Sequence, residues 1–278
     1  MTEPWVAHYR EHGYAIVPGV FDADEIAAIA AQFDLLYRQG LAHGRSYRDR
    51  NSFFAVTDDA ALGTIVRMVQ WPSYFNAALE RIRRDARMLD IVAPLLGTDL
   101  KQIINQLHWK PPGAAMTEFG FHQDSRSRRP REAYRDLAAS YVQTGIAIDP
   151  HRAENGAMTV YPGSHRLGEI PFDPNRRTMN VSLDGRDLER LGLDPAKAVT
   201  LTLAPGDVAL WGVHTLHGSG ANSTASDRRF YLNGYVIAEN CDRGEWAWRD
   251  AAPCPLPDEP SLVHYEALHE APGPMYVD

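Results

Sequence analysis

Cysteine is scarce in this sequence, and no hydrophobic run is long. Cys241 and Cys254 are the only cysteines among 278 residues, too few for a disulfide framework or a thiolate zinc site, so we expect free thiols. No apolar run approaches the roughly 20 residues that cross a bilayer, and residues 1–5 lack the basic and then apolar pattern of a secretory signal. These absences predict a cytoplasmic protein without membrane contact.

Positive charge is also in the minority. Lys and Arg total 28 against 36 Asp and Glu, which gives a formal net charge of −8 and a pI near 5.8. Because nucleic-acid-binding proteins present clustered cations to phosphates, we expect no nucleic-acid partner. The length suits one core, so we predict that residues 1–278 form a single domain, as a monomer or a homodimer.

The first part of the chain has helical patterns. Apolar residues recur at helical spacing over residues 22–39, where Asp22 and Glu25 form the pattern of a capping box and Gly40 supplies a stop. A second helical region is predicted over residues 74–96, bent near its end by a proline and stopped by a glycine.

Short β-prone runs separated by Gly, Pro and Asn follow these helices. This order predicts a mainly β fold with flanking helices: a two-sheet jelly roll over about 100–240, with helical support over about 20–97. The predicted strands are 100–109, 141–148, 157–161, 199–203, 208–211 and 228–237, with 14–17 as an edge strand. The segments 41–62, 125–137 and 166–197 fit no regular element; long loops of this kind are usually lids or binding loops, and some are disordered.

A histidine and an acid two positions apart form the first candidate site. Alternate side chains of a strand share a face, so His122 and Asp124 would point toward one ion. The third ligand must come from a distant segment: His214 and His217 both qualify, and we favour His217 because the glycines after it permit close backbone approach. Imidazole and carboxylate without thiolate suit Fe(II) with open coordination positions. Such pairs also occur by chance on surface strands.

An arginine at the start of the last predicted strand extends this site. Arg228 shares a strand face with the apolar Phe230, and a buried charge there needs an anionic partner. A carboxylate gripped through two parallel hydrogen bonds would supply it, and Ser219 could add a hydroxyl donor. The alternative is a structural acid, which is the expected partner of Arg229 on the outer face.

Six short motifs follow one another along the chain in a specific order. They are Glu11-His12-Gly13-Tyr14-Ala15-Ile16-Val17-Pro18-Gly19, Lys110-Pro111-Pro112-Gly113, His122-Gln123-Asp124, Glu154-Asn155-Gly156, Pro162-Gly163-Ser164-His165, and His217-Gly218-Ser219-Gly220-Ala221-Asn222 followed by Arg228. In order and spacing they resemble the phytanoyl-CoA dioxygenase family of Fe(II)/2-oxoglutarate oxygenases, from about residue 9 to about residue 235.

The resemblance implies a double-stranded β-helix core and a role for each motif residue. It implies His122, Asp124 and His217 as ligands of Fe(II), Arg228 and Ser219 as the clamp on the distal carboxylate of 2-oxoglutarate, and Gln123 and Gln106 as part of the cosubstrate pocket.

The resemblance further implies a dioxygenase that uses O2 to hydroxylate an aliphatic C–H bond of a small molecule, releasing succinate and CO2. Asp124 is intact, whereas related halogenases carry a small residue at this position, so hydroxylation or another oxidative outcome is implied. Gly145 stands where the phytanoyl-CoA hydroxylase itself has a pocket tryptophan, which argues against acyl-CoA as the substrate.

Two other classes of function compete with this interpretation. A jelly-roll isomerase or hydrolase could use Zn(II) or Mn(II) as a Lewis acid, but that chemistry requires no carboxylate clamp such as Arg228 with Ser219. A binding module could keep the fold without turnover, although the complete ligand set argues against it.

Substrate residues are less clearly marked. Arg126, Arg128, Arg129 and Arg131 follow the metal pair, and a basic loop over the mouth of the site would attract a carboxylate, phosphate or phosphonate. A solvated loop that pairs with local acids such as Glu132 is the commoner outcome for such charge runs, and we favour it.

Aromatic residues and one lysine complete the candidates. Trp109, Trp211 and Tyr141 could line an apolar pocket, although aromatics in strands more often belong to the core. Lys110 is either a turn residue or a contact to the cosubstrate.

Overall fold

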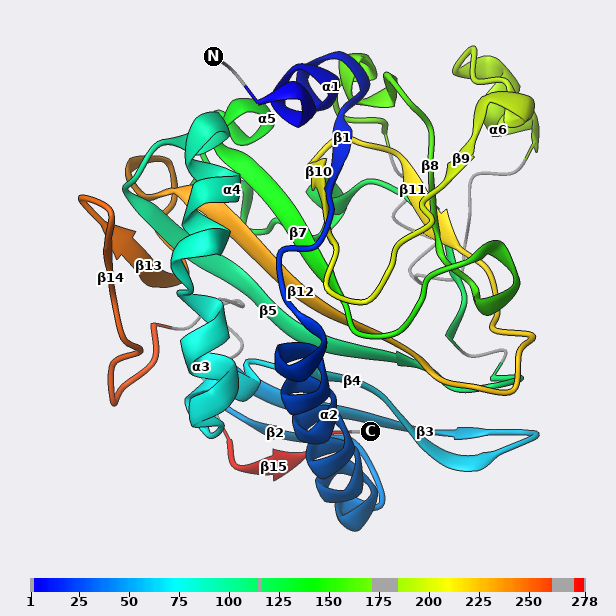
Figure 1. Ribbon diagram of the computed structural model, residues 1–278, viewed down its shortest axis with the longest axis vertical. Helices are drawn as coiled ribbons and strands as arrows, with labels where there is room; N and C mark the ends of the chain where they lie inside the picture. The colour runs from blue at the N-terminus through cyan, green and yellow to red at the C-terminus, as the bar shows by residue number, and fades with distance from the viewer. Residues whose placement is uncertain (1–2, 115–116, 172–184, 262–272, 278) are drawn as a thin grey trace.

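Two antiparallel sheets form the centre of the molecule (Figure 1). The computed structural model describes residues 3–114, 117–171, 185–261 and 273–277. The large sheet has 11 strands, with the path β1-β10-β7-β12-β5-β4-β3-β2-β15; β13 pairs with β5, and β14 pairs with β13. The small sheet has the order β6-β11-β8-β9. This arrangement confirms the predicted β-rich jelly roll.

The elements have the following bounds. The large sheet contains β1 (Tyr14–Val17), β2 (Tyr47–Asp49), β3 (Ser52–Asp59), β4 (Gly63–Gln70), β5 (Leu100–Lys110), β7 (Tyr141–Ala147), β10 (Val208–Gly212), β12 (Arg228–Ile237), β13 (Glu245–Arg249), β14 (Ala252–Pro253) and β15 (Met275–Tyr276). The small sheet contains β6 (Phe119–His122), β8 (Met158–Val160), β9 (Val199–Thr200) and β11 (His217–Ser219). The α-helices are α1 (Pro4–His12), α2 (Ala23–His43), α3 (Ala77–Arg83), α4 (Ala86–Leu96), α5 (Leu137–Ser140) and α6 (Gly185–Arg190).

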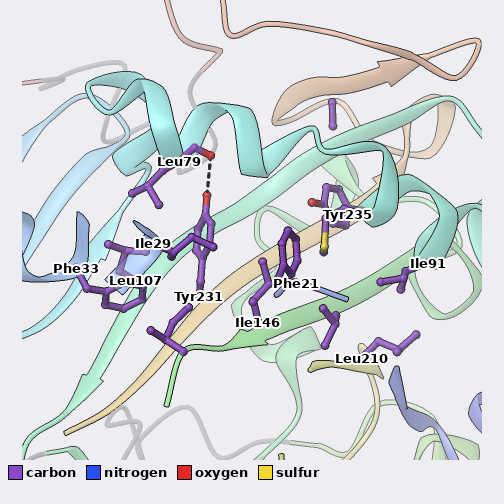
Figure 2. Packing of buried hydrophobic residues seen from close by; sticks show 14 of the residues in the cluster. Phe21, Ile29, Phe33, Leu79, Ile91, Leu107, Ile146, Leu210, Tyr231 and Tyr235 are labelled. Atoms are coloured by element: carbon purple, nitrogen blue, oxygen red, sulfur yellow. Dashed lines mark hydrogen bonds between the residues drawn. The ribbon is translucent and has the colours of Figure 1, made fainter. Parts of the chain in front are cut away.

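Helices α2, α3 and α4 lie across one face of the large sheet (Figure 1). The main hydrophobic core lies between these layers, and Figure 2 shows Phe33, Leu107 and Tyr231 within it. The Tyr231 hydroxyl donates to the carbonyl of Leu79 in α3 at 3.1 Å, so this buried polar tip is satisfied. In the described part of the chain, no helix combines the length and the apolar character needed to cross a membrane.

Strand alternation divides the large sheet into a core face and a site face. On β5, Leu107 belongs to the core under the helices, whereas its neighbours His108 and Gln106 line a cavity on the opposite face. On β12, Tyr231 belongs to the same core and Phe230 lines the cavity. Because the side-chain period of a strand is two residues, the same two strands anchor the core and build the site.

The predicted helices are present, but their boundaries differ. The capping box of Asp22 and Glu25 is confirmed. Gly40 is not a stop, because α2 continues to His43; a Cβ at Gly40 would lie 2.6 Å from a methyl group of Val66, so this glycine allows the helix to approach the sheet. The predicted helix over 74–96 is instead two helices, α3 and α4, because Asp85 caps a new helix start by accepting from the backbone N–H of Arg87.

The prediction of an irregular loop over 41–62 is wrong. Strands β2 and β3 lie in this segment, and β3 pairs with β4 to widen the large sheet beyond β5. Phe54 and Val56 of β3 are buried in the core. The other two irregular segments contain only short helical turns in their described parts, and residues 172–184 lie outside the described residues.

Candidate active site

Three side chains from two distant segments converge where β6 meets β11. His122, the last residue of β6, pairs directly with His217, the first residue of β11. Asp124 begins the short 3-10 helix η3 (Asp124–Ser127) just past the strand end. One ligand atom from each residue lies within 4.8 Å of the others, and this is the one such group of His, Cys, Asp or Glu in the described parts of the chain. The geometry selects His217 over His214 as the third ligand.

Both imidazoles are oriented by backbone carbonyls. Nδ1 of His122 lies 2.7 Å from the carbonyl oxygen of Gly120, and Nδ1 of His217 lies 2.9 Å from that of Thr215. Because a carbonyl only accepts, each Nδ1 carries a proton and each Nε2 keeps a free lone pair. Burial and the neighbouring imidazole also lower the pKa of His122. Each ring therefore presents Nε2 rather than Nδ1 to a metal ion.

Asp124 is oriented by two further side chains. The indole Nε1 of Trp211, on β10, donates to Oδ2 at 3.0 Å, and a terminal guanidinium nitrogen of Arg128 lies 4.0 Å from Oδ1. Burial raises the pKa of this carboxyl, but His217, Arg128 and the indole hydrogen bond outweigh burial and hold the pKa below its usual value. Asp124 is therefore ionised at neutral pH, with one oxygen engaged by Trp211.

Trp211→Phe is expected to weaken metal binding by about 10- to 100-fold, the usual effect of deleting a hydrogen bond to a metal ligand. A phenyl ring can still pack on Phe230, whose ring is 6.3 Å from that of Trp211, so the wall of the cavity should persist. Titration with Co(II), followed by its visible absorption, measures the affinity. Trp246→Phe in β13 is the control, because Trp246 is not among the residues that line the cavity; equal affinities in the two variants would contradict this role.

A cavity of about 300 Å³ opens in front of these residues. This volume is at the small end of the range for ligand sites, which favours a small molecule. Besides the three converging residues, the polar side chains in its lining are Gln70, Gln106, His108, Lys110, Arg126, Ser127, Arg128, Gln143, Ser219 and Arg228. A larger cavity of about 580 Å³ lies beside α2 and β2, and none of these polar residues or of the three converging residues lines it.

Arg228 faces this cavity with unused hydrogen-bonding capacity. The residue is only 4% exposed, one terminal nitrogen donates to the carbonyl of Gly156 at 2.9 Å, and Nε has no partner in the described structure. Burial lowers the pKa of Arg228 to about 10, so it is still charged at neutral pH. Arg229 lies on the opposite face and binds Asp149 at 2.9 Å, which confirms its predicted structural pairing. A buried guanidinium with a free donor fits a carboxylate ligand.

Lys110 and Ser219 lie on neighbouring segments of the cavity wall. The Lys110 ammonium donates to the carbonyl oxygens of Thr117 at 2.5 Å and Gly220 at 2.6 Å, which ties β5 to the segment that follows Ser219. Burial, and then Arg228, lower the pKa of Lys110 to about 6. The carbonyl contacts favour the charged form, so Lys110 serves as a brace whose proton is more easily lost than usual.

Gln106 lines the cavity together with a histidine that sequence reasoning missed. Nε2 of His108 lies 3.0 Å from Oε1 of Gln106. Burial, and then Arg228, lower the pKa of His108 to about 3, so this ring is neutral. The alternation of Gln106, His108 and Lys110 along β5 was the signal that could have placed it in the site.

Three candidate residues have side chains that point away from the cavity. The Gln123 amide points away from the cavity, donates to the carbonyls of Gly168 and His214, and accepts from the backbone N–H of Ile170. The Trp109 ring packs in the core, 4.9 Å from that of Phe33, although the residue also borders the cavity. Tyr141 is buried behind the wall, where its hydroxyl accepts from Arg128 at 2.7 Å.

The four arginines of the loop after Asp124 lie in two different environments. Arg129 and Arg131 form ion pairs with Glu169, which comes from a distant loop rather than from the local acids expected. Arg126 and Arg128 line the cavity. The loop is therefore only partly the solvated charge run that the sequence favoured.

Gly145 has no room for a side chain. A Cβ at this position would lie 2.2 Å from Cζ of Phe230, whose ring lines the cavity. The Phe230 ring thus occupies the space into which a residue on β7 would otherwise project. This part of the cavity wall is therefore formed by the Phe230 ring, which fits only because Gly145 has no side chain.

Gly145→Ala is expected to reduce the free energy of unfolding by about 1–3 kcal/mol, the usual cost of overpacking a buried site. Gly→Ala at an unstrained position would instead stabilise by about 0.4–1 kcal/mol, so the sign of the change tests the clash. Urea unfolding measures it. The double variant with Phe230→Leu should recover most of the loss, and a stabilising single variant would contradict the assignment.

Known proteins of similar sequence include two dioxygenases. The chain is 27% identical over 235 residues to a probable alpha-ketoglutarate-dependent hypophosphite dioxygenase of Stutzerimonas stutzeri, which covers 83% of this chain and 77% of the relative. It is 25% identical over 228 residues to the ectoine dioxygenase of Halomonas elongata, which covers 79% of this chain and 65% of that enzyme.

A solved structure supports the fold. The crystal structure of EctD from S. alaskensis with bound Fe superposes with a TM-score of 0.69 at 21% identity, over 95% of this chain and 89% of that chain. Fold, converging ligands and relatives together define a 2-oxoglutarate-dependent non-haem iron dioxygenase. The sequence profile described as phytanoyl-CoA dioxygenase (PhyH) matches residues 9–230, and the protein belongs to this family.

Proposed function

We propose that this enzyme binds Fe(II) through His122, Asp124 and His217, and 2-oxoglutarate through Arg228 and Ser219, to hydroxylate an aliphatic C–H bond of a small molecule. When bound, Fe(II) and 2-oxoglutarate supply the oxidising chemistry: O2 is consumed, 2-oxoglutarate is converted into succinate and CO2, and the substrate receives one oxygen atom.

The observation that carries this proposal is that one cavity contains both halves of the site. The converging ligand atoms lie within 4.8 Å of one another, and Arg228 in the same wall keeps a buried donor that has no partner in the described part of the chain. Two imidazoles with free Nε2 atoms and one carboxylate are the donor set of Fe(II) oxygenases that keep open coordination positions. The orphaned guanidinium donor suits a carboxylate such as the distal one of 2-oxoglutarate.

The protein's own side chains orient the reactants and exclude water. Arg228 would fix one end of the cosubstrate, and Trp211 would hold Asp124 in one orientation. Met68, Ile104 and Leu232 supply apolar surface in the cavity, which limits access of water to the reacting atoms. The intact carboxylate of Asp124 leaves no ligand position for halide, which favours hydroxylation.

Anaerobic titration with Fe(II) and then 2-oxoglutarate tests this proposal. The expected result is a weak visible charge-transfer band that needs both additions, followed on exposure to O2 by succinate release that a substrate stimulates. An enzyme that uses Zn(II) or Mn(II) as a Lewis acid would show activity without 2-oxoglutarate. A binding module would show the band without turnover on any of the molecules screened, and absence of the band would refute the proposal.

A further inference from the structure

We infer that the substrate is a short, uncharged aliphatic molecule whose hydroxyl or amide group donates a hydrogen bond to a polar wall of the cavity, formed by Gln70, Gln106 and His108. This inference rests on the proposed function and names the class of substrate for the same site. Three observations support it: the free hydrogen-bonding atoms of the polar wall, its distance from the carboxylate clamp, and the absence of charge on its own side chains.

His108 and Gln106 form a hydrogen-bonded pair with one free acceptor and one free donor. Because Oε1 of Gln106 only accepts, Nε2 of His108 carries the proton in their 3.0 Å contact, and Nδ1 keeps its lone pair. Neither this Nδ1 nor the amide nitrogen of Gln106 bonds to a residue that the structure describes. With the amide turned over, donor and acceptor would exchange places, and the pair would still offer one of each. The matching ligand group both donates and accepts, as a hydroxyl or an amide does.

Gln70 extends the polar wall from the neighbouring strand. It lies directly opposite Gln106 in the ladder between β4 and β5, and its buried Oε1 has no partner in the described part of the chain. Its amide nitrogen makes only a 3.8 Å contact to the sulfur of Met68. No strong hydrogen bond therefore fixes this amide, and the last torsion of a glutamine side chain is broad. The amide can turn toward a ligand in the cavity that it lines and accept the hydrogen bond that it otherwise lacks.

The cosubstrate cannot take the place of this donor. At neutral pH 2-oxoglutarate presents only carboxylate and keto oxygens, which accept hydrogen bonds and offer nothing to Nδ1 of His108. Strand register also separates the polar wall from the clamp. Arg228 pairs with Lys110, whereas Leu232 pairs with Gln106, four residues or about 13 Å further along the ladder. Gln106 therefore serves the substrate rather than the cosubstrate pocket in which the resemblance placed it.

Charge near the polar wall favours a neutral group. Burial lowers the pKa of His108 to about 3, so the ring is neutral. The positive charges of Arg228, Arg67 and Lys110 also lower this pKa, and Asp124, the smallest of these influences, raises it. A cation beside the ring would be repelled by these three charges. An anion such as a carboxylate would place acceptors against the His108 lone pair, so an uncharged donor suits the wall best.

The remaining space suits a short aliphatic body. Apolar side chains lie beside the polar wall: Met68 pairs with His108 across the ladder, Leu232 pairs with Gln106, and Ile104 also lines the cavity. A volume of about 300 Å³ must also accommodate 2-oxoglutarate, which excludes long chains. A molecule with one hydroxyl or amide group and a few carbons matches this distribution.

Binding to the Zn(II)- and 2-oxoglutarate-loaded protein tests the inference without turnover. Four probes share one skeleton of heavy atoms: butyramide and 2-pentanol donate and accept hydrogen bonds, whereas 2-pentanone and the anion butyrate only accept them. Ligand-observed NMR measures the dissociation constants. At least one of the two donors should bind about tenfold or more tightly than both acceptors, because only a donor satisfies the free lone pairs of the wall. The tighter of the two donors shows whether the wall receives an amide or a hydroxyl.

The double variant His108→Phe with Gln106→Met should remove this preference. The dissociation constant of the preferred donor should rise about tenfold, while that of 2-pentanone changes by less than about twofold. A phenyl ring can still pack beside Phe119, whose ring is 5.8 Å from that of His108. Gln143→Met is the matched control: Gln143 lines the same cavity, but its Oε1 accepts from the Tyr141 hydroxyl and its amide nitrogen donates to the carbonyl of Thr144 at 3.1 Å. This control should keep the preference for donors.

The outcomes separate the substrate class from the proposed function. If 2-oxoglutarate binds and neither donor binds more tightly than 2-pentanone and butyrate, the substrate class is wrong and the proposed function stands. The class is equally wrong if the double variant keeps the preference, or if Gln143→Met loses it as fully. The comparison of probes uses the unaltered protein, so it decides the question even if the double variant does not fold. If 2-oxoglutarate itself does not bind, the proposed function fails first.

Discussion

Arg228→Gln is expected to raise the dissociation constant for 2-oxoglutarate by about 100-fold or more while leaving Fe(II) affinity nearly unchanged. The residue is 4% exposed, and its buried Nε donor has no partner among the residues that the structure describes. Removing one partner of a buried, hydrogen-bonded charge pair costs about 2–5 kcal/mol, and about 1.4 kcal/mol corresponds to tenfold in affinity. Anaerobic calorimetric titration of 2-oxoglutarate into the Fe(II)-loaded protein measures the change.

Arg229→Gln is the control, since this neighbour points to the other face of β12. Arg229 binds Asp149 at 2.9 Å and Asp34 at 3.0 Å. Its replacement should lower the free energy of unfolding and change 2-oxoglutarate affinity by less than about twofold, as for independent sites. A variant of Arg229 that lost cosubstrate binding while Arg228→Gln kept it would show that the clamp had been assigned to the wrong arginine.

His122→Ala and Asp124→Ala are each expected to weaken Fe(II) binding by more than about 100-fold and to remove substrate-stimulated succinate release. The expectation follows because deleting a direct ligand should cost more than deleting a hydrogen bond to a ligand, which costs about 10- to 100-fold. Metal titration by calorimetry and a coupled succinate assay measure the two effects.

His214→Ala provides the matched control for these variants. His214 lies three positions before His217 and stays outside the converging group; its backbone carbonyl accepts from the Gln123 amide. This variant should bind Fe(II) normally. Full succinate production by Asp124→Ala, or loss of metal binding by His214→Ala alone, would disprove the assigned ligand set.

The parts of the site that could be predicted depend on short-range geometry. The two-position spacing of His122 and Asp124 brings both side chains to one point even though β6 ends between them. The inward Arg228 and outward Arg229 follow from strand alternation. Capping chemistry likewise predicted the start of α2 at Asp22 and Glu25.

The parts that could not be predicted depend on partners far away in the chain. Gly40 has the sequence pattern of a helix stop, but its role is to allow close contact with Val66. Strand β2 was missed because it carries charged side chains near a sheet edge and is only half buried; the short apolar run of β3 gains its strand partner only from β4. For Trp109 the sequence left a pocket and the core open; its ring packs in the core, and the residue also borders the cavity.

The sequence by itself determined the chemistry available to this protein: which side chains can bind a metal, which arginine can receive a carboxylate, and that β-strands present them. These properties follow from residue type and from the local periodicity of the backbone. The tertiary structure alone decided that Glu169 takes two arginines of the basic loop and leaves two for the cavity, and that the ring of Phe230 fills the space above Gly145. These contacts depend on which distant segments pack together and pair their charges. The local spacing of residues does not predict that packing.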